Sequence, residues 1–355
     1  MKTKLHEKSI GVNEVINKEF IFQVNMPFEC CHASNLTLLQ DGSIMATWFA
    51  GSKEGADDVE IWSSKRQKGE WSSPIEITHD EELPHWNPIL YAKEDGTVLL
   101  FYKVGRIISE WYTKLKISKD NGVTWSESID LVEGDRGGRG PVRNKVIKIS
   151  DGTMLAPGST ENGIWKAFAD RSIDGGRSWE KSTAIAIKNL EYIESENIIS
   201  DISVTDQSFK GKGVIQPTFW ESEAGKVHAL LRSTEGKIYK SDSDDGGKNW
   251  SCAYPTVLPN NNSGIDVVKL SNGALVLAYN PVGVNWGPRT PMQLSASLDN
   301  GQTWGNNFVL EDEEGEYSYP SIISDGESIF VTYTWKRKNI AFWEISINDY
   351  FKKDK

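Results

Sequence analysis

Short apolar runs, paired around small turns, recur along the whole chain. Six times an apolar run leads into a turn that contains glycine, in five cases as Asp-Gly or Asn-Gly, and a second apolar run follows. Continuous apolar runs bounded by such turns are typical of buried β-hairpins. The six pairs of runs span residues 35–39 and 44–49, 88–91 and 98–102, 145–149 and 154–156, 215–220 and 227–231, 265–270 and 275–279, and 321–323 and 329–333.

A second pattern, Ser-x-Asp-x-Gly-x-Thr-Trp or a close variant, recurs between these hairpins. It occupies residues 118–125, 172–179, 243–250 and 297–304, with Ser178 and Asn249 in place of the threonine. The tryptophans at 125, 179, 250 and 304 are 54, 71 and 54 residues apart. Trp71, 54 residues before Trp125, ends a degenerate copy of the motif that lacks the aspartate. A fixed period of this length indicates a repeated supersecondary unit. Asp accepts backbone hydrogen bonds and Gly permits a positive φ, so we expect these motifs to be structural turns.

The two patterns together predict the architecture. A third strand, the tryptophan motif and a fourth strand follow each of the first five hairpins. Four strands in each of six units predict an all-β fold, a six-bladed β-propeller with four-stranded antiparallel blades. The sixth unit ends after a third strand at residues 340–345, so we expect residues 20–24 to supply its outer strand and close the ring. The polar stretch 191–207 is expected to be a surface insertion.

The predicted boundaries follow from this pattern. We expect an N-terminal extension at 1–18, one propeller domain at 19–348 with 19–28 as its closing segment, and a C-terminal tail at 349–355.

Composition narrows the range of functions. A net charge of −11 and a pI near 5.1 argue against nucleic acid or an anionic membrane surface as the main partner. The start of the chain lacks a signal-peptide pattern and no run is long enough to span a membrane, which favours a cytoplasmic protein, or a secreted one if a leader has been removed. The three cysteines and five histidines show no disulfide or metal-ligand spacing, so we expect no metal and no cofactor.

The unusual polar residues gather at one end of the predicted inner strands. In an up-and-down blade, the chain enters the first strand and leaves the second strand on the same face, opposite the Asp-Gly turns. A convergence of polar groups there predicts a ligand site. Its candidate members are His32, Asp58, Trp86, Asn87, Arg143, Asn144, Lys145, Glu161, Gln216, Arg232, Asp266, Arg289, Tyr317 and Tyr319.

With four such motifs on a six-unit pattern, residues 28–346 resemble the sialidase (neuraminidase) superfamily of BNR or Asp-box proteins. The resemblance implies a retaining exo-glycosidase with a tyrosine nucleophile, a glutamate that activates it, an aspartate acid/base and three arginines that bind the substrate carboxylate. Tyr317, followed by Ser318, resembles the nucleophile. Arg232 and Arg289 resemble two of the three arginines that bind the carboxylate, which we call the clamp. Asp58 lies where the acid/base is expected, with Asp57 as its rival.

Two features depart from the family pattern. The arginine that opens the first inner strand is replaced by His32, and the position of the activating glutamate is occupied by Gln216, which cannot take a proton from a phenol. Arg143 is then the candidate third clamp residue, and Glu161 the candidate replacement for the base.

Three functions remain open from the sequence. The first is hydrolysis of a terminal acidic sugar, sialic acid or similar, from an oligosaccharide. The second is a uronate-directed lyase in which His32 or His85 abstracts a proton and Tyr317 donates one. The third is a sugar-binding propeller without catalysis, in which Trp86 and Trp286 stack on sugar rings.

Overall fold

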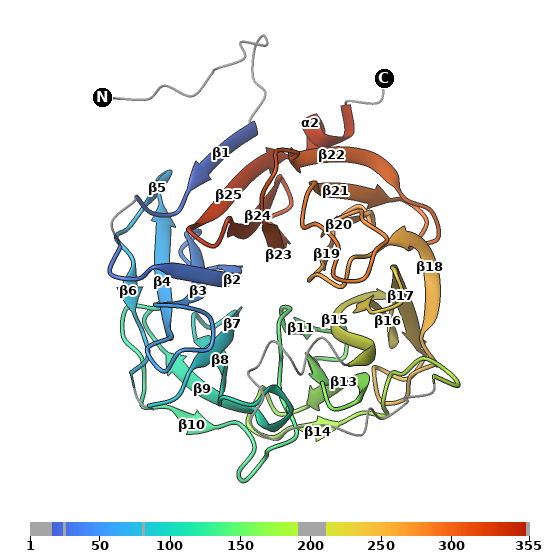
Figure 1. The fold of residues 1–355 in the computed structure, drawn as a ribbon, viewed down its shortest axis with the longest axis horizontal. Helices are drawn as coiled ribbons and strands as arrows, with labels where there is room; N and C mark the ends of the chain where they lie inside the picture. Colours follow the sequence, from blue (N-terminus) through green and yellow to red (C-terminus); the bar gives the residue numbers. More distant parts are fainter. Residues whose placement is uncertain (1–15, 24–25, 80–81, 191–210, 353–355) are drawn as a thin grey trace.

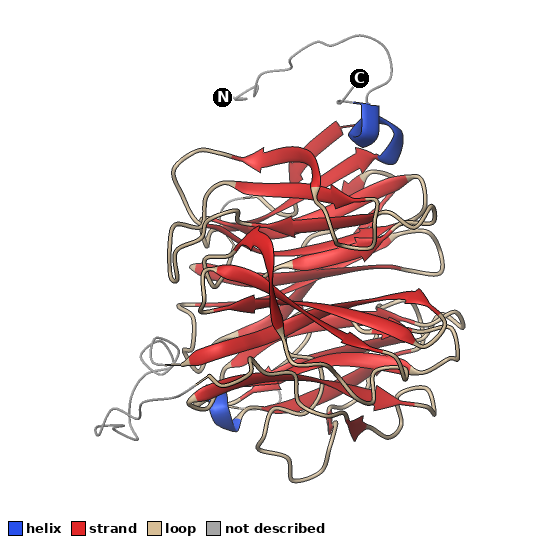
Figure 2. Ribbon diagram, turned by 90° about the vertical axis from the view of Figure 1, so that its right-hand side faces the viewer, coloured by secondary structure: helices blue, strands red, loops and turns tan. Residues whose placement is uncertain are grey.

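The computed structural model describes residues 16–23, 26–79, 82–190 and 211–352. In this part of the chain the strands form five sheets, set side by side around a common centre (Figure 1). A view at right angles shows the strands running across the thickness of this ring (Figure 2). The predicted insertion at 191–207 falls outside the described residues.

The strands of the first two sheets follow in chain order. The first sheet contains β2 (Cys30–Leu38), β3 (Ile44–Gly51), β4 (Glu60–Gln67), β5 (Glu70–Trp71) and β6 (Ile75–Glu76). The second contains β7 (His85–Ala92), β8 (Val98–Val104), β9 (Tyr112–Ser118) and β10 (Ile129–Asp130), with a short 3-10 helix, η1 (Ile108–Glu110), before β9.

An eight-stranded sheet follows and consists of two antiparallel runs. The first run contains β11 (Ile147–Lys148), β12 (Met154–Thr160), β13 (Ile164–Ser172) and β14 (Glu180–Lys181). The second contains β15 (Lys212–Glu223), β16 (Lys226–Ser233), β17 (Lys237–Ser243) and β18 (Tyr254–Pro259). Within the described residues, β13 pairs with β15 over a short parallel stretch, in which Ile164 faces Lys212 and Trp165 faces Gly213, and an isolated parallel bridge joins Ile187 to Ala253.

The last two sheets complete the ring. One contains β19 (Asp266–Lys269), β20 (Leu275–Tyr279), β21 (Met292–Ser297) and β22 (Gly305–Glu311). The other contains β23 (Tyr317–Ser324), β24 (Ser328–Trp335), β25 (Asn339–Ser346) and β1 (Ile16–Phe20), and a short helix, α2 (Ile347–Lys352), follows β25. No helix in the described ranges is both long and apolar enough to cross a membrane.

The six hairpins predicted from the apolar runs are confirmed. They correspond to the antiparallel pairs β2–β3, β7–β8, β11–β12, β15–β16, β19–β20 and β23–β24. The first member of each pair lies nearest the centre in Figure 1, and we call β2, β7, β11, β15, β19 and β23 the inner strands. The apolar side chains of the hairpins make up the core between neighbouring sheets.

The N-terminal closing strand pairs with β25 as predicted, but its predicted residues are wrong. The strand is Ile16–Phe20, not residues 20–24, and Phe20 lies opposite Ala341. Ile21 and Phe22 instead pack into a core cluster that includes Trp48. An outer strand needs only one apolar face, whereas the most apolar residues of this segment are buried beyond its end.

The tryptophan motifs are turns held by their aspartates. Asp120 accepts hydrogen bonds from the backbone N–H groups of Val123 and Thr124, at 3.1 and 2.9 Å, and from the Thr124 hydroxyl. These bonds, that of the Thr124 hydroxyl first, lower the pKa of Asp120 to about 2. Gly122 has a φ of +80°, which strains any residue with a side chain, and a Cβ there would also lie 2.7 Å from the Met45 sulfur of the preceding sheet, so glycine is strongly favoured.

A bulge recurs near the start of four inner strands. The register breaks between His32 and Asn35, Trp86 and Ile89, Ile215 and Thr218, and Ser318 and Ser321. The first residue inside each break has a positive φ, and these residues are Ala33, Asn87, Gln216 and Tyr319. In three of the four a proline follows, which suits a position that donates no ladder hydrogen bond. These bulges decide which side chains reach the centre of the ring.

Candidate active site

Tyr319 is the central residue of the candidate site. It lies in the bulge of β23, with its side chain partly exposed and its ring surrounded by cations. The guanidinium carbons of Arg143, Arg232 and Arg289 lie 5.1, 5.7 and 5.6 Å from the ring centroid. The imidazole of His32 packs against the same ring, with the two centroids 4.2 Å apart. Four residues that are far apart in the sequence thus meet at the phenol of a fifth.

Arg232, at the end of β16, holds the hydroxyl group of this tyrosine. Its Nη1 donates to Tyr319 Oη at 2.9 Å and to Gln216 Oε1 at 3.1 Å, and its Nε donates to Asn262 Oδ1 at 2.9 Å. All three acceptors are neutral, and within the described residues Arg232 forms no ion pair. A buried cation held only by neutral acceptors retains its full charge for an anionic ligand.

Arg143, in the segment before β11, lies deeper. Its Nη2 donates to the carbonyl oxygens of Tyr319 and Pro320, the latter at 2.9 Å. These hydrogen bonds hold the backbone of the β23 bulge in place. Its Nε and Nη1 have no hydrogen-bond partner among the described residues, although the side chain is only 1% exposed. Burial lowers the pKa of Arg143 to about 10, which keeps it cationic at neutral pH. Unused donors on a buried cation favour a bound anion or water.

Arg289, in the loop between β20 and β21, belongs to an ion-pair network. It donates to Glu316 at 2.7 Å, Arg337 donates to the same Glu316 oxygen at 2.8 Å, and Arg337 also pairs with Glu54. Burial alone would raise the pKa of Glu316, but the two arginines hold it below its ordinary value. Glu316, Arg337 and Asn262 were not predicted as site residues, although Glu316 immediately precedes Tyr317 in the sequence.

Two ionisable groups of the site have strongly shifted pKa values. Burial raises the pKa of Glu161, just after β12, to about 7, against the opposing effect of the nearby Arg232 charge. Burial and then the charges of Arg337, Arg289, Arg143 and Arg232 lower the pKa of His32 well below its usual value. His32 is therefore neutral, with Nδ1 2.8 Å from Thr334 Oγ1. Acids and bases whose pKa values are strongly shifted, and which lie in one polar site, are typical of catalytic sites.

Tyr317, the predicted nucleophile, does not reach this site. Its side chain is fully buried in a core cluster with Met292 and Tyr333. In a regular strand Tyr317 and Tyr319 would face the same side, but the bulge at Tyr319 breaks this alternation. Of the two tyrosines, only Tyr319 lies among the arginines.

Several other predicted residues have structural contacts. Trp86 is 2% exposed, donates to the Gly105 carbonyl and packs on Trp111, so the prediction that it stacks on a sugar is wrong. Asn87 is buried in the β7 bulge. Asn144 donates to the Gln216 and Pro217 carbonyls and so ties β15 to its neighbour.

Lys145 and Asp266 form a buried link across the centre. The Lys145 ammonium donates to both Asp266 oxygens at 2.7 Å, and Asp266 also accepts from the Thr218 hydroxyl and the Ile322 amide. This one carboxylate therefore joins β15, β19 and β23 below the site, which makes it a structural group rather than a ligand contact.

The remaining candidates lie at the edge. Asp58 is exposed in the loop after β3 and accepts from the amide and the hydroxyl of Ser52, at 3.0 and 2.9 Å. Asp57 pairs with Arg106 on the surface. His85 is buried beside Glu60 and Thr78, away from the arginine cluster by its contacts. Among the described residues no three acidic, histidine or cysteine side chains are grouped to hold a metal ion.

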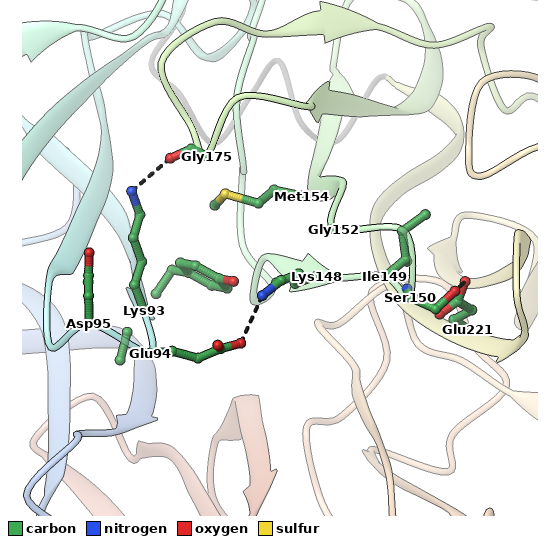
Figure 3. A pocket seen from close by; sticks show the side chains of 12 residues that line it. Lys93, Glu94, Asp95, Lys148, Ile149, Ser150, Gly152, Met154, Gly175 and Glu221 are labelled. Carbon is green, nitrogen blue, oxygen red and sulfur yellow. Dashed lines mark hydrogen bonds and ion pairs between the residues drawn. The ribbon is translucent and has the colours of Figure 1, made fainter.

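A hollow of about 740 Å³ lies at the other end of the inner strands (Figure 3). It is lined largely by residues of the Asp-Gly turns, and its two lysines already have hydrogen-bond partners. Lys148 pairs with Glu94 at 2.8 Å, and Lys93 donates to the Gly175 carbonyl at 2.7 Å. The arginine cluster is the stronger candidate for a ligand site because three guanidinium groups converge there and Arg143 has two buried donors without a partner among the described residues.

Comparison with known proteins places the chain in a family. A family model described as a BNR repeat-like domain matches residues 42–331. The chain belongs to the BNR repeat-like family. Within the sialidase and BNR-repeat superfamily it is a divergent member. The comparison with curated proteins gave no match.

Solved structures share the fold of this BNR repeat-like protein at low identity. The Hadza microbial sialidase Hz136 is 17% identical with a TM-score of 0.71, over 90% of this chain and 66% of the sialidase. The NanB sialidase from Streptococcus pneumoniae is 15% identical with a TM-score of 0.73, over 93% of this chain and 71% of NanB. A protein of unknown function from Dyadobacter fermentans DSM 18053 is 16% identical with a TM-score of 0.72, over 94% of this chain and 99% of that protein. This likeness establishes a common fold.

Proposed function

We propose that this protein is a sialidase-like exo-glycosidase that hydrolyses a terminal acidic sugar, with Tyr319 as its nucleophile. The observation that carries the proposal is the contact of the Tyr319 hydroxyl with Arg232 inside a group of three arginines. Planar guanidinium groups suit a carboxylate, and an acidic protein needs such a local excess of positive charge to bind an acidic sugar. The ligand class is supported by the sialidases that share the fold.

The architecture that fits this function is a six-bladed propeller. In the part of the chain that the structure describes, β13 and β15 share two residue pairs, far fewer than β12 shares with β13 or β15 with β16, so we count the two antiparallel runs of the eight-stranded sheet as separate blades. The six inner strands then belong to six blades, and the pairing of β1 with β25 joins the two ends of the chain in the last of them.

Each site residue has a proposed role in the reaction. Tyr319 attacks the anomeric carbon, and Arg232 and Arg289 bind the substrate carboxylate. The more deeply buried Arg143 adds positive charge to the site. Gln216 accepts a hydrogen bond from Arg232 and cannot act as a base, so Glu161, whose pKa is about 7, takes the phenol proton. Asp58 remains the proposed acid/base, on the loop that also carries Glu54 of the ion-pair network.

A uronate-directed lyase is the second candidate, and His32 favours it. A neutral imidazole against the Tyr319 ring, beside cations that neutralise a carboxylate, is suited to abstract the proton next to that carboxylate. Tyr319 would then protonate the leaving oxygen. Both candidates use the same tyrosine and the same arginines.

The test is a panel of terminal sialosides and uronosides with product masses as the readout. Addition of water indicates hydrolysis, and an unsaturated product that absorbs in the ultraviolet indicates elimination. Tyr319→Phe should lower turnover by at least ~10²-fold, the scale of a lost proton transfer and a lower bound for a lost nucleophile. Tyr317→Phe is the matched control and should retain turnover, because its side chain lies in the core. Normal turnover of the Tyr319→Phe variant would remove tyrosine from the mechanism.

A further inference from the structure

A second group of reactive side chains lies on the sheet formed by β15 to β18, away from the arginines. Ser222 Oγ is 2.7 Å from His228 Nε2, and His228 Nδ1 is 2.5 Å from Asp242 Oδ1. All three side chains are partly exposed. The proposed glycosidase reaction uses none of them.

Strand register brings these residues to one face of the sheet. Trp220 lies opposite His228 in the β15–β16 pair, and His228 lies opposite Asp242 in the β16–β17 pair. Ser222 is two residues beyond Trp220, beside the register shift between Glu221 and Glu223. Cross-strand neighbours share a face, so the register alone aligns tryptophan, histidine and aspartate.

The next sheet fixes the tautomer of the histidine. Trp220 Nε1 can only donate, and it donates to Asn300 Oδ1 at 2.7 Å. The amide nitrogen of Asn300 therefore faces His228 Nε2, at 3.1 Å, and Nε2 must be an acceptor. The proton of the neutral ring then lies on Nδ1, where it is donated to Asp242. Nε2 presents its lone pair to the Ser222 hydroxyl, whose other acceptor, the Lys226 carbonyl, is 3.5 Å away.

Asp242 is itself held in place by neighbouring side chains. Tyr254 donates to Asp242 Oδ2 at 2.6 Å, and the Lys240 ammonium lies 3.7 Å from Oδ1. The imidazole ring stacks on Trp220, with centroids 5.1 Å apart. The Lys269 ammonium, 3.2 Å from the Ser222 carbonyl oxygen, supplies positive charge beside the serine. A hydroxyl, a base and an orienting carboxylate in this order are the arrangement that activates a serine nucleophile.

We propose that Ser222, His228 and Asp242 form a second, acyl-transferring site that hydrolyses small carboxylic esters. Ser222 Oγ adds to the ester carbonyl while His228 Nε2 takes the hydroxyl proton. His228 returns that proton to the departing alkoxide, so an alcohol leaves and an acyl-serine remains. Water, deprotonated by the same imidazole, then adds to the acyl carbonyl. As the bond from the acyl carbon to Ser222 Oγ breaks, His228 gives that proton to Oγ, so the carboxylic acid leaves and the serine is restored.

The test uses the full chain and a fluorophosphonate probe, which reacts with activated serines and displaces fluoride. Intact mass should show one added phosphonyl group, and peptide mapping should place it on Ser222. The Ser222→Ala variant should take up no label. Asp242→Asn should slow labelling by at least ~10²-fold, because a neutral amide no longer stabilises the imidazolium that forms when His228 takes the serine proton.

A matched control and a turnover assay complete the experiment. Ser150→Ala removes a nearby serine whose hydroxyl faces the Glu221 carboxylate, at 2.9 Å, instead of an imidazole, and should label at the parent rate. Hydrolysis of p-nitrophenyl acetate should fall at least ~10-fold in Ser222→Ala and should not change in Ser150→Ala. An unlabelled parent, a label at another residue, or equal labelling rates of the parent and the Asp242→Asn variant would each overturn the proposal.

Discussion

Replacement of Glu161 by glutamine should make folding stability less sensitive to pH. The pKa of Glu161 rises from 4.5 to about 7 because the carboxyl is buried, with the Arg232 charge opposing the rise. The folded protein thus holds this proton more tightly than the unfolded chain. The stabilisation is fully present below pH 4.5 and is lost as the pH rises through about 7. Glutamine carries no charge at any of these pH values.

The magnitude follows from the size of the shift. At about 1.4 kcal/mol for each unit of pKa, the upper limit is about 3 kcal/mol. The residue is partly accessible to solvent, and water reduces the penalty, so we expect ~1–3 kcal/mol. At pH 8 the Glu161→Gln variant should exceed the parent in free energy of unfolding by that much more than it does at pH 4.5.

Urea unfolding at pH 4.5, 6 and 8 measures this difference. Glu127→Gln, which changes an exposed glutamate in the same way, is the control and should show a difference that is small at every pH. If the parent and the Glu161→Gln variant differ equally at pH 4.5 and at pH 8, burial does not shift this carboxyl. The role of Glu161 as the base would then lose its physical support.

Two further predictions concern the clamp and the turns. Arg289→Lys should weaken binding of an acidic sugar by ~10-fold or more in calorimetry, since lysine lacks the planar guanidinium group that pairs with a carboxylate. The substitution should barely affect binding of an analogue whose carboxylate is reduced to an alcohol. Equal affinity of the parent for both sugars would argue against the clamp. Trp179→Ala should cost about 2–3 kcal/mol in urea unfolding, below the range for a fully buried ring, because Trp179 is half-buried against Phe101. Turnover of the folded fraction should not change, and a variant with normal stability but lost turnover would contradict this.

The sequence predicts the strands well because local chemistry determines them. Apolar runs around Asp-Gly turns leave little choice but a hairpin, and all six predicted hairpins form. The closing strand was displaced by four residues because its pattern is weak. In an outer strand, charged residues such as Lys18 and Glu19 are as suitable as apolar ones, whereas Ile21 and Phe22 are more stable in the core.

The site is less predictable because a bulge cannot be recognised from apolar alternation. The predicted residues Arg143, Arg232, Arg289 and His32 do surround one tyrosine, and Glu161 lies near the Arg232 charge. The choice between Tyr317 and Tyr319 depended on a positive φ at a non-glycine residue, which propensity does not indicate. The group of Ser222, His228 and Asp242 was not predicted from the sequence, for another reason. It depends on the register of three strands and on Asn300 from a neighbouring sheet.

Gln216 occupies the position where the resemblance to sialidases implies a glutamate, and this constrains the proposed chemistry more than any other feature. Gln216 uses its oxygen to accept from Arg232, so the position still orients the clamp but no longer removes a proton. In the proposed reaction the Tyr319 proton passes to another group, and the two candidates are His32, which packs on the tyrosine ring, and Glu161, which lies near the Arg232 charge. Glu161 titrates near pH 7, so a reaction that depends on its ionised form accelerates as the pH rises through 7. His32 is neutral well below that pH, so a reaction that depends on His32 alone shows no such rise. The pH profile of turnover therefore separates a hydrolase with Glu161 as base from a lyase with His32 as base.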